Sequence, residues 1–292
     1  MKISRRHLLH GLSVGAVLAA MNRDSLKQSA AEAQERTASK KDGSLRYVRF
    51  KFGEKSAYGI VDQDRVRELE GNLFDSPAET GKTYPLNEAE LLWPCEPSKI
   101  LALAGNYKSH LGETPLPKNP EVFIKSPSAL LAPGGTIVIP PGVRNVHYEG
   151  EMVVVIGKKA KNVSPAEAAS CVFGVTCGND VSERDWQKND RQWWRAKASD
   201  TFAPLGPWIV RGIDYGNLLL TTRLNGDVKQ QARTSELVFD VPAIVSFISK
   251  HMTLLPGDLI YTGTPGQTSA MKPGDTVEVE IERTGVLTNR VA

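Results

Sequence analysis

The distribution of apolar residues along the chain predicts many short strands and few helices. Apolar or alternating runs at Tyr47–Phe52, Tyr58–Val61 and Ile100–Ala104 are typical of strands, and turn-forming residues interrupt them. Further runs of this kind lie at residues 136–139, 151–157, 172–177 and 218–224. Because strands dominate and turns recur about every 8–12 residues, we expect a closed or rolled β-architecture.

Three segments have helix signals. Ser164-Pro165-Ala166-Glu167 predicts a helix start, because serine caps, proline tolerates the first turn and the glutamate can complete a capping box. Asp240-Val241-Pro242 predicts a second helix, which runs to about Met252. The segment Glu88–Leu92 is a third, shorter helix candidate.

Turn motifs predict how several strands are connected. Asn225-Gly226 follows the apolar run Leu218–Leu224 and predicts a hairpin with a tight primed turn. Pro256-Gly257-Asp258 and Pro273-Gly274-Asp275 are nearly identical, and each precedes a strand-like segment. We interpret this pair as one turn used twice and not as a domain repeat.

The chain after residue 33 divides into unequal parts. Residues 34–44 are small and polar and predict a flexible linker. Residues 45–97 contain strand-like runs without a cluster of reactive groups, which predicts a small N-terminal β-rich domain. Residues 98–292 contain most of the strands and all of the candidate chemistry, so this part is the expected catalytic domain.

The N-terminus has the pattern of an export signal. Ser4-Arg5-Arg6-His7 precedes a short apolar run, and Ala31-Glu32-Ala33 is a small-residue exit. The paired arginines resemble a twin-arginine signal over residues 1–33, which predicts export to the bacterial periplasm. A membrane span needs about 20 apolar residues, and this run is shorter and is interrupted by His10.

Composition and charge narrow the function classes. The chain has 292 residues, of which 40% are hydrophobic and 24% charged, which excludes a disordered or multi-span membrane protein. Its formal charge of +3 comes from residues 1–33, which contain five basic and two acidic residues, so the remaining chain is formally neutral. No basic segment with interleaved aromatic residues remains, and nucleic acid is not an expected partner.

Two glutamates and an aspartate form a candidate metal site. Glu149 and Glu151 are two residues apart on a predicted strand, so both carboxylates are expected on one face. Val153 and Val155 continue that face, and Asp180 follows the apolar run 172–177. Three carboxylates suit a hard cation such as Mg²⁺ or Mn²⁺. The alternative is a solvated acidic pair at a strand end.

A second cluster suggests acid–base chemistry. If residues 106–113 include a helical turn, His110 and Glu113 are neighbours three positions apart, and a carboxylate beside an imidazole makes it a better base. The alternative is an incidental ion pair on a surface helix. The following Pro-rich segment, residues 114–120, is stiff enough to form a lid.

Motifs in the second part of the chain carry a family resemblance. They are N-Y-x-x-H-x-x-E, F-I-K-S-P-S, Y-E-x-E-x-x-V-V-I-G, N-D-V-S-x-R-D-x-Q and G-T-P, at residues 106–113, 123–128, 148–157, 179–187 and 263–265. Shorter phrases at residues 200–208, 224–226 and 273–275 match as well. In this order the motifs resemble the fumarylacetoacetate hydrolase family over about residues 98–292.

The resemblance implies a mostly β (α+β) protein with a rolled mixed-sheet core, and a homodimer. It implies that Glu149, Glu151 and Asp180 bind a divalent metal, Mg²⁺ first, with Mn²⁺ or Ca²⁺ as alternatives. It also implies a catalytic histidine and glutamate on a mobile lid, a lysine that faces the oxygens bound to the metal, and substrate contacts nearby. The catalytic residues are then His110, Glu113 and Lys197, and the substrate contacts are Lys125, Arg184, Gln187 and Thr264.

The activity implied is hydrolysis of a carbon–carbon bond in a small acylpyruvate-like diketo acid. Decarboxylation of 2-oxo acids, isomerisation of a 2-hydroxy-dienedioate and cleavage of ureidoglycolate are alternatives on the same site. A different class is an exported binding protein that has kept the fold without the activity. The presence of the His110–Glu113 pair, the three carboxylates and Lys197 together favours an enzyme.

Overall fold

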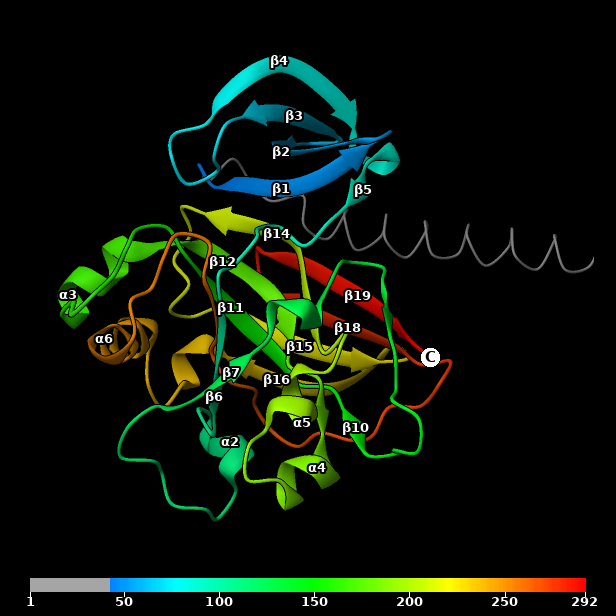
Figure 1. Ribbon diagram of the computed structural model, residues 1–292, viewed down its shortest axis with the longest axis vertical. Coiled ribbons are helices and arrows are strands. Elements are labelled where there is room, and N and C mark those ends of the chain that lie inside the picture. Colours follow the sequence, from blue (N-terminus) through cyan, green and yellow to red (C-terminus); the bar gives the residue numbers. More distant parts are fainter. Residues whose placement is uncertain (1–42) are drawn as a thin grey trace, which may run out of the picture. The chain divides into compact units, whose positions relative to one another are not determined.

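Strands make up most of the regular structure in the computed structural model, which describes residues 43–292 (Figure 1). The predicted signal peptide and nearly all of the predicted linker lie outside the described residues. Within 43–292, no helix is both long and apolar enough to cross a membrane.

The largest sheet has twelve strands among the described residues. Ten of them follow one path, with β5 (Glu90–Leu91) added beside β1 and β8 (Leu130–Leu131) beside β14. The order along that path is β4 (Ala78–Pro85), β3 (Arg65–Glu70), β2 (Lys55–Asp62), β1 (Leu45–Phe52), β14 (Ala203–Arg211), β12 (Val172–Asn179), β11 (Gly150–Ile156), β17 (Leu259–Tyr261), β6 (Ile100–Ala104) and β7 (Glu121–Lys125).

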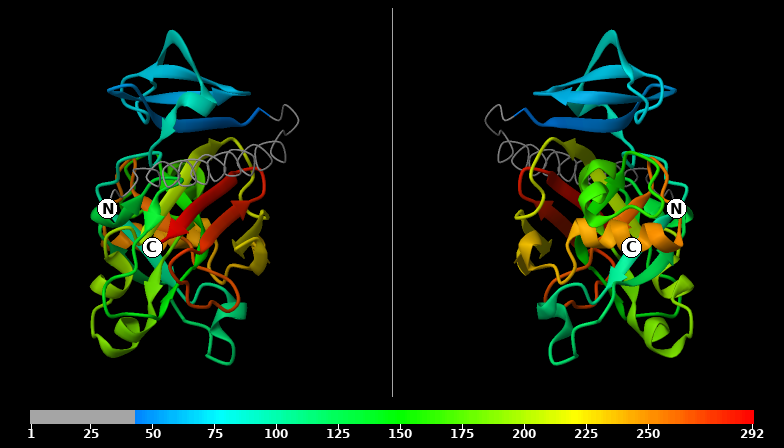
Figure 2. Two further views of the ribbon diagram at one scale, coloured as in Figure 1. Left: turned by 90° about the vertical axis from the view of Figure 1, so that its right-hand side faces the viewer. Right: turned by 90° about the vertical axis from the view of Figure 1, so that its left-hand side faces the viewer.

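A second sheet and short helices complete the described structure. The second sheet has the order β16 (Asp227–Arg233), β15 (Leu219–Leu224), β18 (Thr276–Ile281), β19 (Gly285–Val291) and β9 (Thr136–Ile137), and β10 (Val146–His147) pairs separately with β13 (Ser182–Glu183). The α-helices are α2 (Lys108–Leu111), α3 (Pro165–Ala168), α4 (Arg184–Asn189), α5 (Trp194–Ala198) and α6 (Val241–His251). The right-hand view of Figure 2 shows α3 (green) beside α6 (orange), in agreement with the contacts between the two helices.

Pairing directions confirm the predicted mostly β fold with a mixed-sheet core. Most neighbours are antiparallel, but β17 runs parallel to β6, β8 to β14 and β9 to β19. The N-terminal strands are not separate from the larger sheet, because β1 pairs with β14 from Leu45 opposite Arg211 to Tyr47 opposite Ile209. The boundary placed at residues 97 and 98 by the sequence stays a prediction.

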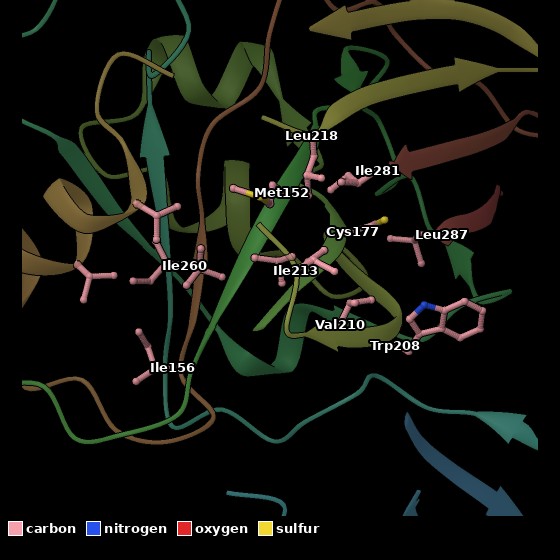
Figure 3. Packing of buried hydrophobic residues seen from close by; sticks show 14 of the residues in the cluster. Met152, Ile156, Cys177, Trp208, Val210, Ile213, Leu218, Ile260, Ile281 and Leu287 are labelled. Carbon is pink, nitrogen blue, oxygen red and sulfur yellow. The ribbon is translucent and has the colours of Figure 1, made fainter. Parts of the chain in front are cut away.

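Strand β11 lies at the centre of the core and is buried on both faces. Met152 and Val154 belong to a cluster that joins the large sheet to β15, β18, β19 and α6 (Figure 3). Val153 and Val155 point the other way, into a second cluster that includes Tyr261 of β17. Alternation along a strand explains how one segment serves two clusters.

Several local predictions are confirmed. Ser164 and Glu167 form the capping box of α3, and Asp240 caps α6 through the Ala243 N–H. Asn225 and Gly226 both have positive φ, 54° and 85°, as a primed two-residue turn between β15 and β16 requires.

The helix predicted at Glu88–Leu92 is wrong. Residues Leu86–Glu88 form a single 3₁₀ turn, and Glu90–Leu91 then form strand β5. Strand β14 pairs with β1 only from Leu45 to Tyr47, which leaves the rest of that edge open. Strand β5 pairs with this open edge at Phe50 and Lys51. Pairing with an open strand edge therefore outweighs the weak local helix preference.

The repeated Pro-Gly-Asp motif forms the same turn twice. An oxygen of Asp258 accepts the Leu255 N–H at 2.7 Å, and an oxygen of Asp275 accepts the Lys272 N–H at 2.9 Å. Asp258 is also fully buried and accepts hydrogen bonds from the Ser98 hydroxyl, two backbone N–H groups and the Lys99 ammonium. Asp258 therefore also ties the loop before β6 to the start of β17.

Replacing Asp258 with alanine should destabilise the protein by about 3–5 kcal/mol, because it leaves the Lys99 ammonium and several N–H groups without their acceptor. Asp275→Ala should cost only about 1–2 kcal/mol, since it removes a turn bond and one contact from Asn225. Urea unfolding of the two variants measures the difference. Equal losses would contradict the anchoring role of Asp258.

Candidate active site

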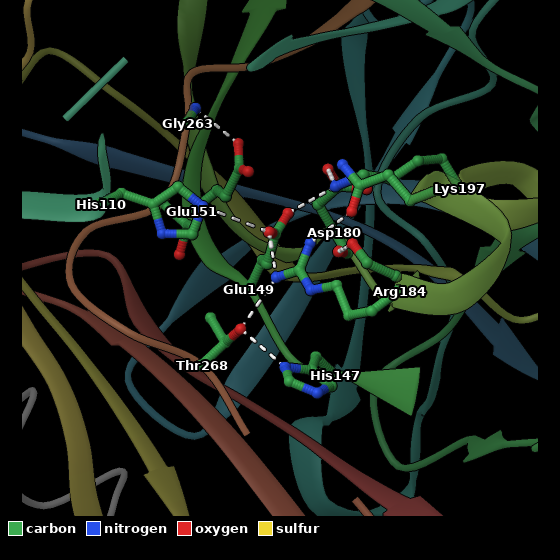
Figure 4. Close-up of polar contacts among 12 residues, drawn as sticks. His110, His147, Glu149, Glu151, Asp180, Arg184, Lys197, Gly263 and Thr268 are labelled. Atoms are coloured by element: carbon green, nitrogen blue, oxygen red, sulfur yellow. Dashed lines mark hydrogen bonds and ion pairs between the residues drawn. The ribbon is translucent and has the colours of Figure 1, made fainter. Parts of the chain in front are cut away.

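The ends of β11 and β12 bring the three predicted acidic residues together. Glu149 immediately precedes β11, Glu151 lies on it, and Asp180 immediately follows β12. The antiparallel register sets Gly150 opposite Asn179, and the Asp180 N–H donates to the Glu149 carbonyl oxygen at 2.8 Å. One carboxylate oxygen from each acid lies within 4.8 Å of the others, and all three residues are buried (Figure 4).

The segment that follows β17 lies beside Glu151 and forms one side of the site. The Gly263 N–H donates to Glu151 Oε2 at 2.6 Å. Gly263 has φ +105°, and a Cβ there would lie 2.8 Å from the Cβ of Asn106. Asn106 is fixed in turn, because its side-chain amide donates to the Thr262 carbonyl oxygen at 2.8 Å. Glycine is therefore required at position 263 on both conformational and steric grounds.

Three cationic side chains surround the acidic triad. Lys197 of α5 donates to Glu149 Oε2 and to Asp180 Oδ2, both at 2.6 Å. Arg184 of α4 donates to Glu149 Oε1 at 2.6 Å. Lys125, fully buried at the end of β7, donates to Asp180 Oδ1 at 2.5 Å and to the Lys197 carbonyl oxygen.

These cations compensate two of the three carboxylates. Burial disfavours ionisation of Glu149, but the charges of Lys197 and Arg184 outweigh it and hold its pKa well below the usual range. Burial and then the negative charges of Asp180 and Glu149 raise the pKa of Glu151 well above its ordinary value. Among the described residues, Glu151 is thus the carboxylate of the triad without a direct cationic partner.

The residues present fit a hard divalent cation. The donor set is three carboxylates, the oxygen ligands that such cations prefer. A cation would also supply the positive charge that Glu151 lacks, and each carboxylate oxygen has a lone pair beyond the one already used. The predicted triad of Glu149, Glu151 and Asp180 is therefore a candidate metal site.

His110 reaches this site from α2. Its Nδ1 lies 2.6 Å from the Gly266 carbonyl oxygen, and its Nε2 lies 3.7 Å from Glu149 Oε1. A carbonyl oxygen only accepts hydrogen bonds, so Nδ1 carries a hydrogen and donates it to Gly266. Nε2 is the nitrogen directed toward the triad (Figure 4), and in the neutral tautomer that the Gly266 contact selects it carries the lone pair.

Glu113 does not join His110 in the structure. Helix α2 ends at Leu111, and Gly112 follows with φ +60°, a conformation that cannot continue a right-handed helix. Glu113 is exposed, and within 43–292 it makes no hydrogen bond or ion pair with the His110 ring. The neighbour relation expected three positions apart along a helix is therefore absent.

The predicted substrate-contact residues occupy different environments. Thr264 is buried, and its hydroxyl donates to the Gly150 carbonyl oxygen at 2.8 Å while accepting from Gln230 at 2.8 Å. Gln187 accepts from Arg184 Nη1 at 2.8 Å. Arg184 and Gln187 are partly exposed, and the side chain of Arg184, which is 19% exposed, lies directly beside Glu149.

The sequence did not indicate how Arg184 is oriented. Thr268 Oγ1 lies 2.8 Å from both Arg184 Nη2 and His147 Nδ1, and His147 Nε2 lies 2.8 Å from Asn145 Oδ1. Burial and then the charge of Arg184 lower the pKa of His147 to about 4, so its ring is neutral at neutral pH. His147 therefore donates to Asn145 and accepts the Thr268 hydroxyl hydrogen, which leaves the Thr268 oxygen to accept from Arg184.

The fold and the site together define a candidate metal site of three carboxylates at the strand ends of a mixed β-sheet. The chain belongs to the fumarylacetoacetate hydrolase family: residues 99–292 match the family model described as fumarylacetoacetate (FAA) hydrolase C-terminal. Residues 45–94 match a second model, described as Rv2993c-like, N-terminal. Members of this family are enzymes that act on small molecules and commonly use divalent metals.

Similar proteins carry several activity names. The chain is 46% identical over 238 residues to protein Rv2993c of Mycobacterium tuberculosis, covering 80% of this chain and 90% of that protein. It is 39% identical over 222 residues to oxaloacetate tautomerase FAHD2A of Bos taurus, covering 71% of each. The crystal structure of 2-hydroxyhepta-2,4-diene-1,7-dioate isomerase from Mycobacterium marinum matches with a TM-score of 0.80 at 43% identity, over 85% of this chain and 99% of that one.

A divalent cation should stabilise the folded protein through Glu149. Manganese at about 100 times its dissociation constant should add about 2.7 kcal/mol, and Glu149→Gln should remove that gain because a neutral amide replaces a carboxylate ligand. Thermal unfolding with and without MnCl₂ measures this. Glu113→Gln is the matched control and should keep the gain; equal stabilisation of the Glu149 variant would rule out the metal site.

Proposed function

We propose that this protein is a metal-dependent isomerase of 2-oxo acids, which moves a proton at the carbon next to the 2-oxo group. Keto–enol tautomerisation of oxaloacetate is the simplest reaction of this class. The observation that carries the proposal is the arrangement of His110, whose Nε2 is directed toward the acidic triad while Nδ1 is hydrogen-bonded to the Gly266 carbonyl oxygen.

The chain's own residues account for binding and charge stabilisation. Although burial opposes it, the charges of Asp180 and Glu149 raise the pKa of Lys197, so its side chain is an ammonium at neutral pH. Lys197 and Arg184 are then positive charges close to the place where a substrate carboxylate and a developing enolate oxygen must lie. A divalent cation held by the triad would add Lewis-acid stabilisation of that negative charge.

The proton transfer itself needs one base. His110 Nε2 takes the proton from the carbon next to the 2-oxo group, and the electron pair of that C–H bond forms the carbon–carbon double bond of the enolate. The Lys197 ammonium faces the oxygen on which the charge collects. Return of the proton to oxygen gives the enol, and return to a more distant carbon of a conjugated acid gives the isomer.

The position of Glu113 favours proton transfer over hydrolysis. Hydrolysis as inferred from the sequence needs Glu113 to orient His110 while that base activates water, and within residues 43–292 the two side chains share no hydrogen bond or ion pair. Proton transfer needs only the contact between His110 and Gly266. The names of the bovine tautomerase and the mycobacterial isomerase support the same reaction class.

The remaining sequence predictions stay predictions. They are Mg²⁺ as the native ion, a homodimer and export by the twin-arginine route. Hydrolysis of acylpyruvates, decarboxylation and ureidoglycolate cleavage are outcomes that the experiment below separates from tautomerisation.

His110→Asn should lower the rate of enol-to-keto conversion of oxaloacetate about 10²–10⁴-fold, because it removes the general base. Glu113→Gln should change that rate less than about threefold, since the carboxylate does not contact His110. Both rates follow from the absorbance of the enol in the presence of MgCl₂. Lys159→Arg, at an exposed residue beyond the end of β11 opposite the triad, controls for a general effect of substitution.

Acetylpyruvate provides the contrasting assay. Release of pyruvate from acetylpyruvate at a rate that His110→Asn and Glu113→Gln both abolish, with no effect of either change on oxaloacetate, would contradict the tautomerase proposal and support the hydrolase. Tautomerisation without pyruvate release would support the proposal.

A further inference from the structure

We infer that Gln230 of the second sheet and Ser109 of α2 are positioning residues for His110. Together they hold the Pro265–Gly266 peptide, and this peptide places the Gly266 carbonyl oxygen that selects the tautomer of the His110 ring. The inference rests on the proposed function, because it assigns what keeps the proposed base in its active form.

Two acceptors compete for the hydrogen of the neutral His110 ring. The Gly266 carbonyl oxygen lies 2.6 Å from Nδ1, and Glu149 Oε1 lies 3.7 Å from Nε2. Hydrogen on Nδ1 leaves the lone pair on Nε2, whereas hydrogen on Nε2 directs an N–H toward the triad and removes the base. Because a carboxylate is the stronger acceptor, a small retreat of the Gly266 oxygen would shift the ring toward the inactive tautomer. The position of this oxygen is therefore a functional requirement.

Gln230 holds the oxygen of the Pro265–Gly266 peptide. Gln230 is buried on β16, and its Nε2 donates to the Pro265 carbonyl oxygen at 2.6 Å and to Thr264 Oγ1 at 2.8 Å. Its Oε1 accepts the Gly150 N–H at 3.1 Å. A carbonyl oxygen cannot donate and a backbone N–H cannot accept, so only one orientation of the amide satisfies these contacts. Gln230 thus ties the residues before Gly266 to the start of β11.

A closed ring of hydrogen bonds keeps Gln230 in place. Thr264, which accepts from Gln230, donates its own hydroxyl hydrogen to the Gly150 carbonyl oxygen at 2.8 Å, and the Gly150 N–H returns to Gln230. Glycine at position 150 permits this approach, because a Cβ there would lie 1.9 Å from Thr222 Oγ1 on β15, the residue paired with Gln230. A connected network of this kind resists displacement more than a single hydrogen bond does.

Ser109 holds the other side of the same peptide. The Gly266 N–H donates to Ser109 Oγ at 3.1 Å, and Ser109 is exposed on α2, directly before His110. The oxygen and the N–H of a planar trans peptide point in opposite directions, so Gln230 and Ser109 hold the Pro265–Gly266 peptide from its two sides. Only the two backbone torsions of Gly266 then separate this fixed peptide from the carbonyl oxygen that binds His110.

The ring nitrogens of His110 report the tautomer directly. Nitrogen NMR of the neutral ring, with MgCl₂ present and signals assigned by their loss in His110→Asn, should show hydrogen on Nδ1 in the wild type. Gln230→Met keeps the side-chain length but removes its hydrogen bonds, and should raise the ratio of the Nε2–H to the Nδ1–H tautomer about tenfold. Ser109→Ala, an exposed substitution, should raise it about threefold.

Asn289→Leu is the matched control for a merely structural role. Asn289 is a buried amide on β19 that donates to the Ala132 and Gly135 carbonyl oxygens, both at 3.0 Å. Its replacement also leaves two carbonyl oxygens without a donor, so the temperature of thermal unfolding should fall about as much as in Gln230→Met. The tautomer ratio of His110 should stay within about twofold of the wild type, since no contact of the Pro265–Gly266 peptide changes.

Turnover of oxaloacetate separates this inference from the proposed function. Gln230→Met should lower kcat about tenfold and change KM less than about twofold, because only the population of active base falls. An unchanged tautomer ratio in Gln230→Met and Ser109→Ala, or an equal shift in Asn289→Leu, would overturn the inference. If Gln230→Met does not fold, the ratio in Ser109→Ala decides. Absence of wild-type turnover would overturn the proposed function instead, and the tautomer ratios would still test the positioning role.

Discussion

The active site depends on compensating three carboxylates that the fold buries in one place. Glu149, Glu151 and Asp180 meet because β11 and β12 pair in a fixed register, and like charges at this separation in a low-dielectric interior repel strongly. Lys197 and Lys125 reach in from α5 and β7 to offset part of that charge. The positions of these elements around the strand ends are thus tied to one electrostatic requirement.

The same compensation leaves a defined chemical capacity. Glu149 and Asp180 each contact cations of the chain, while Glu151, within the described part of the chain, accepts only the Gly263 N–H and gains most from an added divalent ion. On the opposite side, the loop after β17 fixes His110 through the Gly266 carbonyl oxygen. A centre that places cationic side chains beside buried carboxylates and directs one imidazole toward them suits removal of a proton next to a carbonyl group.

Parts of this arrangement could be predicted from the sequence, and the reasons differ from residue to residue. Because side chains alternate along a strand, the spacing predicted that Glu149 and Glu151 share one face. The capping residues predicted the starts of α3 and α6. Local spacing wrongly predicted a helix at Glu88–Leu92, because Glu90 and Leu91 pair as a strand with the open edge of β1. It also wrongly predicted a contact between His110 and Glu113, because α2 ends before Gly112. The link from Thr268 to Arg184 joins residues 84 positions apart and has no local signal.

The exchange of carbon-bound hydrogen for deuterium tests the central claim most directly. In D₂O with MgCl₂, the protein should catalyse exchange of the C3 hydrogens of 2-oxobutanoate, a 2-oxo acid with no bond that the hydrolase reaction could cleave. Proton NMR should show loss of the C3 signal with the wild type and only the background rate with His110→Asn. Equal exchange rates for the wild type and this variant, or no exchange above background, would contradict proton transfer by His110 at the acidic triad.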